Sequence, residues 1–167
     1  MIPFKVETSG DELLTLSKRA FNRVMKATYF AVGRYWDRHF VATHFKVTAR
    51  RKYGYLPRSR KYEAKKKRLA KTWKVKKQGR VDLVFTGLTE RIVSRPHAVR
   101  AFPTRATVSM AAPSYIMSRT RKRRALKQEL LLVSDQEYQK LEEVALAAQT
   151  AAFEEEMRPK RGRRRRR

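Results

Sequence analysis

Basic residues are gathered into blocks along this chain, and the blocks limit which segments can form a folded core. Residues 38–80, 119–127 and 158–167 hold 31 of the 42 Lys and Arg residues, and the formal net charge of the chain is +27. The first block contains one carboxylate, Glu63. Side chains of this kind are almost never fully buried unless they are paired, so the core must come mainly from other segments. A compact chain this positive repels itself, and we therefore expect a polyanion or an acidic protein surface as partner.

The composition is sufficient for one domain. The chain has 167 residues, of which 41% are hydrophobic, and domains cluster at roughly 100–150 residues. We expect a single domain over 1–157, a basic arm inserted at 46–80 that lies outside the core, and a disordered arginine-rich tail at 158–167. The absence of cysteine excludes disulfides, thiolate metal sites and cysteine nucleophiles. No apolar run approaches the roughly 20 residues that span a bilayer, and the first residues lack the apolar stretch of a signal peptide, so an intracellular origin is predicted.

A long amphipathic helix is predicted near the start of the chain. Apolar side chains recur every three or four residues from Leu13 to Tyr35, which indicates a helix over about 11–38. Ser9 and Glu12 have the spacing of a capping box at its start.

A second long helix is predicted over 135–157. Ser134 and Glu137 give it a stronger capping box, because this pair follows one apolar run and opens a periodic one. The helix ends in Glu154-Glu155-Glu156, which we interpret as an exposed helix end or as an intramolecular partner for the arginines that follow it.

Short strands are predicted between the helices and at the start of the chain. After the predicted strand 81–85, Thr86 suits a helix cap and Gly87 suits a tight turn. An interface role for this pair is the alternative. The predicted strands are 2–7, 81–85, 97–102, 105–111 and 127–133. A short helix is predicted over 88–94 and an exposed loop over 119–124. A basic helix over 60–73 is predicted to form on contact with a partner. Two long helices covering one face of a small, mainly antiparallel sheet define an α+β fold.

The basic arm gives the sharpest functional hypothesis. Its cations can neutralise phosphates, with a steep loss of affinity as salt rises, and its aromatic rings Tyr62 and Trp73 can stack on bases or anchor the arm. No motif that reads base sequence is present. The alternative is a solvated loop that becomes ordered on an acidic neighbouring subunit. The predicted contacts with nucleic acid or an acidic partner are Arg50, Arg51, Lys52, Arg58, Arg60, Lys61, Lys65, Lys66, Lys67, Arg68, Lys71, Trp73, Lys74, Lys76, Lys77, Arg121, Lys122, Arg123 and Arg124.

Catalytic and metal sites are not expected. The only histidines are His39, His44 and His97, and no cluster of carboxylates accompanies them, whereas zinc sites need four ligands, or three and a water. The chain lacks a glycine-rich phosphate loop. Asp82 and Glu90 are the only acids near the predicted central strands, too few for a metal-dependent nuclease. We therefore predict neither an enzyme nor a cofactor.

The order of the predicted elements resembles a known family. A long amphipathic helix and a basic excursion precede Leu83-Val84-Phe85-Thr86-Gly87, a short helix, a hairpin ending in Ala112-Pro113-Ser114-Tyr115, a strand, and Val133-Ser134-Asp135-Gln136-Glu137 at the start of the last helix. This order is similar to that of the virion-morphogenesis or tail-completion proteins of tailed bacteriophages, which join head and tail. The similarity is best over 80–157. Leu88 departs from the pattern because it follows Gly87 directly, where the family has leucine one position later.

The resemblance implies a virion structural protein of the head–tail junction, of the tail-completion, neck or tail-terminator type. Copies would form a homo-oligomeric ring, with the portal or adaptor and the tail tube as neighbours and packaged DNA as a further candidate partner. Such a protein is made in the host cytoplasm and resides in the virion, with no membrane partner. A second hypothesis, from composition alone, is a basic nucleic-acid-binding module of the ribosome- or nucleoid-associated kind, which would bind RNA or DNA as a monomer.

Overall fold

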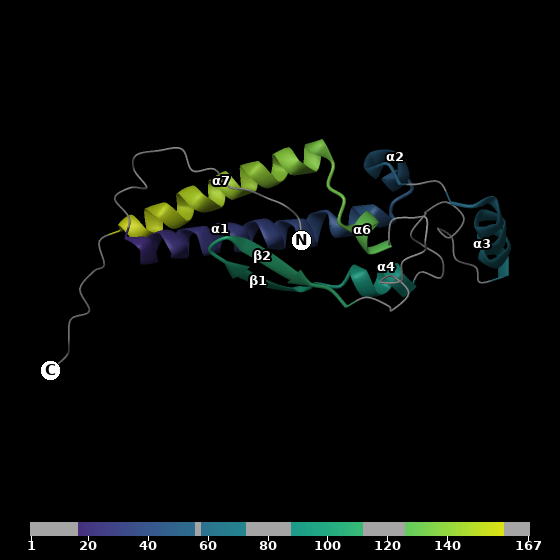
Figure 1. Ribbon diagram of the computed structural model, residues 1–167, viewed down its shortest axis with the longest axis horizontal. Helices are drawn as coiled ribbons and strands as arrows, with labels where there is room; N and C mark the ends of the chain where they lie inside the picture. Colours follow the sequence, from purple (N-terminus) through teal and green to yellow (C-terminus); the bar gives the residue numbers. More distant parts are fainter. Residues whose placement is uncertain (1–16, 56–57, 73–87, 112–125, 159–167) are drawn as a thin grey trace.

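The computed structural model of the chain describes residues 17–55, 58–72, 88–111 and 126–158 (Figure 1). Two long helices lie side by side, a hairpin packs against the first of them, and short helices gather at one end of an elongated body. The elements are α1 (Lys18–His39), the 3-10 helix η2 (Val41–Phe45), α2 (Ala49–Tyr53), α3 (Arg60–Thr72), α4 (Leu88–Val93), β1 (Ala98–Phe102), β2 (Arg105–Ser109), α6 (Leu126–Leu130) and α7 (Asp135–Met157). The predicted strands 2–7 and 81–85 and the predicted loop 119–124 lie outside the described residues.

Helix α1 begins later than the sequence pattern predicts. Ser17 is extended (φ −60°, ψ 151°), and its side chain accepts a hydrogen bond from the backbone amide of Ala20, which makes it the N-cap. The prediction of a start near residue 11 is therefore wrong. Apolar side chains continue across the cap, so their spacing could not locate the start of the helix. The predicted capping box lies outside the described residues. The apolar stripe itself is confirmed, with Val24 and Trp36 buried along α1.

Helix α7 begins at the predicted capping box. The Ser134 hydroxyl accepts a hydrogen bond from the backbone amide of Glu137, and the Glu137 carboxylate accepts one from the amide of Ser134 at 3.1 Å. Leu141 is buried on the face of α7 that packs along α1. Near its end, Glu156 forms a two-bond ion pair with Arg23 of α1, at 2.5 Å and 2.6 Å. The two long helices are thus joined along their length.

The hairpin approaches α1 closely at Gly33. Strands β1 and β2 are antiparallel, with Val99 opposite Val108. A Cβ atom on Gly33 would lie 2.9 Å from Cγ1 of Val99 and 3.2 Å from Cβ of Ala106, closer than side chains normally approach. Glycine is therefore the residue that lets the sheet rest on the helix. The two predicted strands of this hairpin are confirmed, with slightly shorter bounds.

A buried contact also ties the hairpin to α1. The carboxylate of Asp37 accepts a hydrogen bond from the backbone amide of His97 at 3.0 Å, and its second oxygen lies 2.5 Å from Nδ1 of the same histidine. Both side chains are buried. His97 immediately precedes β1, so this contact fixes where the hairpin begins.

The main core includes the first part of the segment that was predicted as an arm. Ala49, Tyr53 and Tyr55 are buried in one cluster with Trp36 of α1. The prediction that the chain leaves the core at residue 46 is therefore wrong for residues 46–55. The aromatic rings of residues 46–55 are buried, whereas the Lys and Arg side chains of this segment are exposed. Net charge alone does not reveal this arrangement.

The predicted strand 127–133 is also wrong. The chain forms the short helix α6, and the amides of Leu131 and Leu132 then bond to the carbonyl oxygens of Gln128 and Glu129, at 3.3 Å each. Leu130 is buried in the core. A short apolar run fits a buried helical turn as well as a strand, which explains the error.

The structure confirms the α+β class. The long helices α1 and α7 pack with a two-stranded antiparallel sheet, and α1 lies between α7 and the hairpin (Figure 1). Helix α4 confirms the helix predicted over 88–94, and α3 shows that residues 60–72 are helical in the single chain, without the partner contact on which the prediction depended. This arrangement leaves α3 at the end of the body, beyond the short helices.

Candidate anion-binding surface

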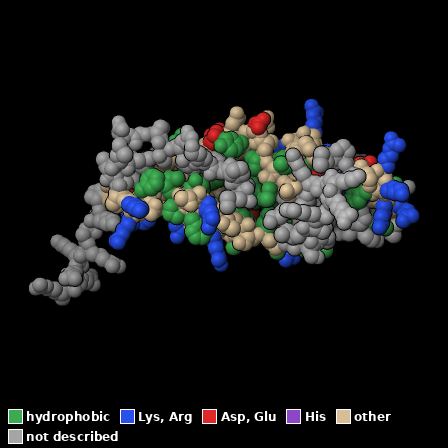
Figure 2. All heavy atoms as spheres, in the orientation of Figure 1, with side chains coloured by type: hydrophobic (Ala, Val, Ile, Leu, Met, Phe, Trp, Pro, Cys, Tyr) green, Lys and Arg blue, Asp and Glu red, His purple; other side chains and the backbone are tan. Residues whose placement is uncertain are grey.

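Helix α3 presents a dense cationic surface. Its 13 residues contain seven Lys or Arg residues and one carboxylate, Glu63. Basic side chains project from the end of the molecule where α3 lies (Figure 2). The exposed cations of this helix, called the α3 surface below, are Arg60, Lys61, Lys65, Lys67 and Arg68.

The opposite side of α3 faces inward. Lys66 is 5% exposed, and its ammonium lies 6.0 Å from the ring centroid of Tyr62. Tyr62 and Leu69 are half-buried. The helix therefore has a cationic outer side and a partly aromatic inner side, and Lys66 belongs to the inner one.

A buried ion pair holds the chain just before α3. The guanidinium of Arg58 pairs with the carboxylate of Glu129 in α6, and the two side chains are 9% and 1% exposed. Buried charges are costly to leave unpaired, so each of these residues requires the other. The pair fixes the base of α3 to the folded body.

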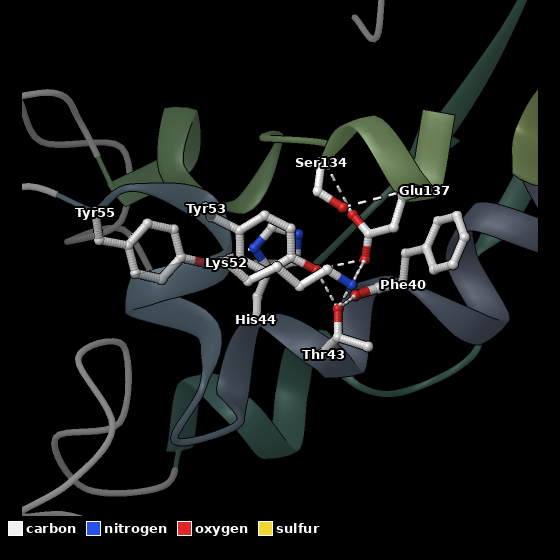
Figure 3. Close-up of polar contacts among 8 residues, drawn as sticks. All are labelled: Phe40, Thr43, His44, Lys52, Tyr53, Tyr55, Ser134 and Glu137. Atoms are coloured by element: carbon white, nitrogen blue, oxygen red, sulfur yellow. Dashed lines mark hydrogen bonds and ion pairs between the residues drawn. The ribbon is translucent and has the colours of Figure 1, made fainter. Parts of the chain in front are cut away.

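A stack of rings holds the preceding segment. The rings of His44 and Tyr53 lie 4.0 Å apart at 12°, and the Tyr55 hydroxyl lies 2.5 Å from Nδ1 of His44 (Figure 3). Gly54 separates the two tyrosines and has a positive φ of 60° at the C-cap of α2. This left-handed residue turns the chain so that both tyrosine rings lie beside one histidine.

Glu137 connects the ring stack to α7. Its Oε1 atom accepts hydrogen bonds from the hydroxyl of Tyr53 at 2.6 Å and from the ammonium of Lys52 at 2.7 Å (Figure 3). Thr43 lies beside the same oxygen at 3.3 Å. The other carboxylate oxygen accepts a hydrogen bond from the backbone amide of Ser134 in the capping box. One nearly fully buried carboxylate thus caps α7 and holds α2 at the same time.

The environment of this cluster sets its protonation. Burial lowers the pKa of His44 from 6.5 to about 4, despite the nearby charge of Glu137. Burial and the hydrogen bond to Glu137 raise the pKa of Tyr53 well above its usual value. For Glu137 burial acts to raise the pKa, but the hydrogen bonds from Lys52 and Tyr53 outweigh it and the pKa is lowered from 4.5. Near neutral pH the histidine is therefore uncharged and the carboxylate ionised.

The cluster is suited to a structural role. The His44 side chain is fully buried, so it cannot meet a substrate from solvent, and no hydrogen-bond partner for its Nε2 atom lies among the residues that the structure describes. Within the described part of the chain, no three His, Asp or Glu side chains converge closely enough to hold a metal ion. What the arrangement can do is hold the segment that leads to α3 against the folded body.

The structure brings together some of the predicted contact residues and separates others. Five of them form the α3 surface, and Lys71 lies in the last turn of the same helix. Arg51 is exposed on α2, beside a recess of about 410 Å³ that it lines with Lys52 and the first turn of α7. Arg50 lies 3.7 Å from the carboxylate of Glu63, while Lys52, Arg58 and Lys66 make the contacts described above. The predicted residues outside the described ranges are Trp73, Lys74, Lys76, Lys77, Arg121, Lys122, Arg123 and Arg124, together with the turn residues Thr86 and Gly87.

Sequence reasoning missed the residues that position α3. Glu137 was predicted as a cap, and its second role depends on a tyrosine 84 residues away. The partners Arg58 and Glu129 are 71 residues apart, and nothing local pairs them. The one available signal was Tyr53-Gly54-Tyr55, two aromatic rings around a glycine inside a basic run, which is typical of a buried turn.

No family model, curated protein or solved structure matches the chain. Of the helices in the described ranges, none is long and apolar enough to cross a membrane. The function of the α3 surface must therefore be inferred from its own geometry and charge.

Proposed function

We propose that this chain is a virion structural protein of the head–tail junction, of the tail-completion, neck or tail-terminator type, and that its α3 surface binds DNA or an acidic neighbour. The observation that carries the proposal is the set of five exposed cations on one helix at the end of the body. A polyanion or acidic surface would neutralise the charge of these five cations.

The geometry of α3 supports simultaneous contact with several anionic groups. Lys61, Lys65 and Arg68 are spaced by four and three residues and share one side of the helix, over about 10 Å of its length. The base of this helix is held by the Arg58–Glu129 pair. Cations on a fixed helix lose less conformational entropy on binding than cations on a free loop.

The order of elements supports the structural class. A long helix, a basic segment, a short helix, a hairpin and a long closing helix follow one another, an order that resembles the tail-completion family except that helix α6 stands where a strand was predicted before the closing helix. In this proposal, copies form a ring in the virion after synthesis in the host cytoplasm, beside the portal or adaptor and the tail tube. The body makes protein contacts, and the α3 surface holds DNA or an acidic neighbour by charge.

The second candidate is a nucleic-acid-binding module of the ribosome- or nucleoid-associated kind. The same α3 surface favours it, because clustered cations bind phosphates irrespective of sequence. The two candidates differ in assembly. A module of this kind binds nucleic acid as a monomer, whereas a junction protein binds weakly alone and orders into a larger assembly.

The test is to size the purified chain by sedimentation velocity, with and without duplex DNA, over a range of salt concentrations. We expect a monomer or poor solubility at low salt without DNA, retention on DNA that vanishes at about 0.5 M salt, and larger assemblies when DNA or virion neighbours are present. Salt-resistant, sequence-selective binding by a monomer would contradict the proposal and favour the second candidate.

A further inference from the structure

Helix α7 carries an exposed acidic side. It contains seven of the 15 carboxylates of the chain and a single lysine. On the exposed side, Glu143 and Glu154 flank Leu146 and Thr150, and Leu146 is 67% exposed. An apolar centre between two acidic ends therefore lies open on this helix.

A groove on the other side of the body has the complementary character. It lies between α1 and β1, has a volume of about 590 Å³, and has Ala27 and Val99 in its lining. Phe30 and Phe102 also line it and are 46% and 44% exposed, which is unusual for large apolar rings. Lys26 and Arg100 add exposed positive charge to the same lining. Hydrophobic and basic side chains lie side by side over this part of the body (Figure 2).

The two surfaces match in spacing. On α1, Arg23 and Arg34 are eleven residues apart, with Ala27 and Phe30 between them on the same side of the helix. On α7, Glu143 and Glu154 are also eleven residues apart. Each interval corresponds to about 16 Å along a helix. A cation, an apolar centre and a second cation can therefore face a carboxylate, an apolar centre and a second carboxylate.

We propose that α7 of one copy docks in the groove between α1 and β1 of a second copy. Leu146 packs against Ala27 and Phe30 there, and the carboxylates at the two ends meet Arg23 and Arg34. Opposite charges at the contact offset part of the repulsion between two strongly positive chains. This inference rests on the proposed function, since it names the surface through which the copies of a ring would meet.

The contact joins two different patches, so it is heterologous. Contacts of this type repeat from copy to copy and generate a closed ring or an open filament. Two intramolecular ion pairs lie at its ends, Arg23 with Glu156 and Lys140 with Glu143. The side chains of Arg23 and Glu143 are 54% and 65% exposed, so each can also face the second copy.

Site-directed cross-linking tests this contact, because the chain has no cysteine of its own. One sample carries Ala27→Cys, a second carries Leu146→Cys, and the two are mixed with a short bismaleimide in the presence of duplex DNA. The matched control replaces Ala27→Cys by Val47→Cys, another exposed apolar position at 58% exposure. We expect at least about tenfold more cross-linked dimer from the first mixture, as a specific contact requires.

Charge reversal tests the complementarity. Arg23→Glu with Arg34→Glu in the groove copy should lower the cross-linking yield, and Glu143→Lys with Glu154→Lys in the α7 copy should restore it. Arg91→Glu with Arg95→Glu reverses two exposed cations outside the groove with the same change in net charge and should leave the yield unchanged. Equal effects of the two reversals would show that net charge alone controls association and would overturn the proposal.

Three further outcomes would overturn it. The first is a yield no higher than that of the Val47→Cys control. The second is preferential cross-linking of Leu146→Cys to itself, which would show that α7 pairs with α7. The third is loss of the cross-link when an added single-stranded oligonucleotide protects the Ala27→Cys thiol. This result would show that the groove binds bases, since exposed rings beside guanidinium groups can also stack on them.

Retention on DNA is measured on the same samples. Retention without the cross-link contradicts the contact and leaves the proposed binding by the α3 surface standing. If the unmodified chain is not retained on DNA, the proposed function itself is contradicted.

Discussion

The carboxylate of Glu137, in the first turn of α7, accepts a hydrogen bond from the hydroxyl of Tyr53, 84 residues earlier, at 2.6 Å. This bond joins the start of the last helix to the end of α2. The basic segment that leads to α3 is thereby held at the core on one side, and the pair of Arg58 with Glu129 holds it on the other. A chain with net charge +27 uses several of its few carboxylates to fix its cations in place.

Replacing Tyr53 by phenylalanine should destabilise the fold through loss of this bond. We expect Tyr53→Phe to lower the free energy of unfolding by about 1–2 kcal/mol, and Glu137→Gln by about 2 kcal/mol because it also removes the charge that faces Lys52. A double-mutant cycle measured by urea unfolding should give a coupling of about 1 kcal/mol. Strict additivity of the two losses would show that the bond contributes nothing.

The free energy of unfolding should fall as the pH is lowered through the range in which His44 titrates. The pKa of His44 is about 4 in the folded chain and 6.5 in the unfolded one, so the unfolded state takes up the proton first. Stability is therefore complete above about pH 6.5 and declines towards pH 4. Stability curves from chemical denaturation at several pH values measure this.

The variant His44→Phe keeps an aromatic ring beside Tyr53 and removes the titrating group. Its stability should be flatter than that of the parent between pH 6.5 and 4, whatever its absolute value. The contribution of Glu137 lies in a lower window: its pKa is depressed from 4.5, so its contribution is lost only as the pH falls below that value. A parent chain whose stability is constant over the upper window would contradict the assignment.

Adding a methyl group at Gly33 should destabilise the protein, although alanine is the better helix former. The new Cβ would lie 2.9 Å from Val99 and 3.2 Å from Ala106, so Gly33→Ala must push the hairpin away from α1. We expect a loss of about 1–2 kcal/mol in the free energy of unfolding. The companion change Val99→Ala makes room for the methyl group, and the double variant should lose less than the two single losses combined. A stabilised Gly33→Ala variant would show that the hairpin does not rest on this residue.

Breaking the ion pair beneath α3 should cost more than removing an exposed cation from it. Arg58→Met leaves the carboxylate of Glu129 buried and unpaired, and we expect a loss of about 3 kcal/mol in the free energy of unfolding. Arg60→Met, at an exposed position of the α3 surface, should change stability by less than about 0.5 kcal/mol. The double variant Arg58→Met with Glu129→Leu removes both charges and should recover most of the loss. Similar values for the two single variants would contradict a buried pair.

The sequence was sufficient to predict the elements whose signals are local. Ser134 and Glu137 located the start of α7, and regular apolar spacing predicted both long helices. The hairpin followed from two short runs around Pro103 and Thr104. The start of α1 was misplaced because the apolar spacing extends beyond its cap at Ser17.

The surroundings of the candidate site could be predicted only in part. The cations of α3 follow directly from composition, but the burial of Tyr53 and Tyr55 depends on a stack with His44 that no local pattern specifies. The pairing of Arg58 with Glu129 likewise depends on tertiary packing. Residues that look alike in a basic run therefore have different roles, and only the folded chain separates them.

The salt dependence of binding to duplex DNA tests the role of the α3 surface most directly. The affinity is measured at several salt concentrations for the full chain, for the variant Lys61→Gln/Lys65→Gln/Arg68→Gln, and for a control, Arg38→Gln/Arg91→Gln/Arg95→Gln, whose cations are equally exposed elsewhere. The logarithmic salt slope should become shallower by about 0.9 for each phosphate that the protein no longer neutralises, hence by about 2–3 in the α3 variant, and should stay within about 1 of the parent in the control. Equal slopes for the two variants would show that DNA senses only the net charge of the chain, and would contradict a binding surface on α3.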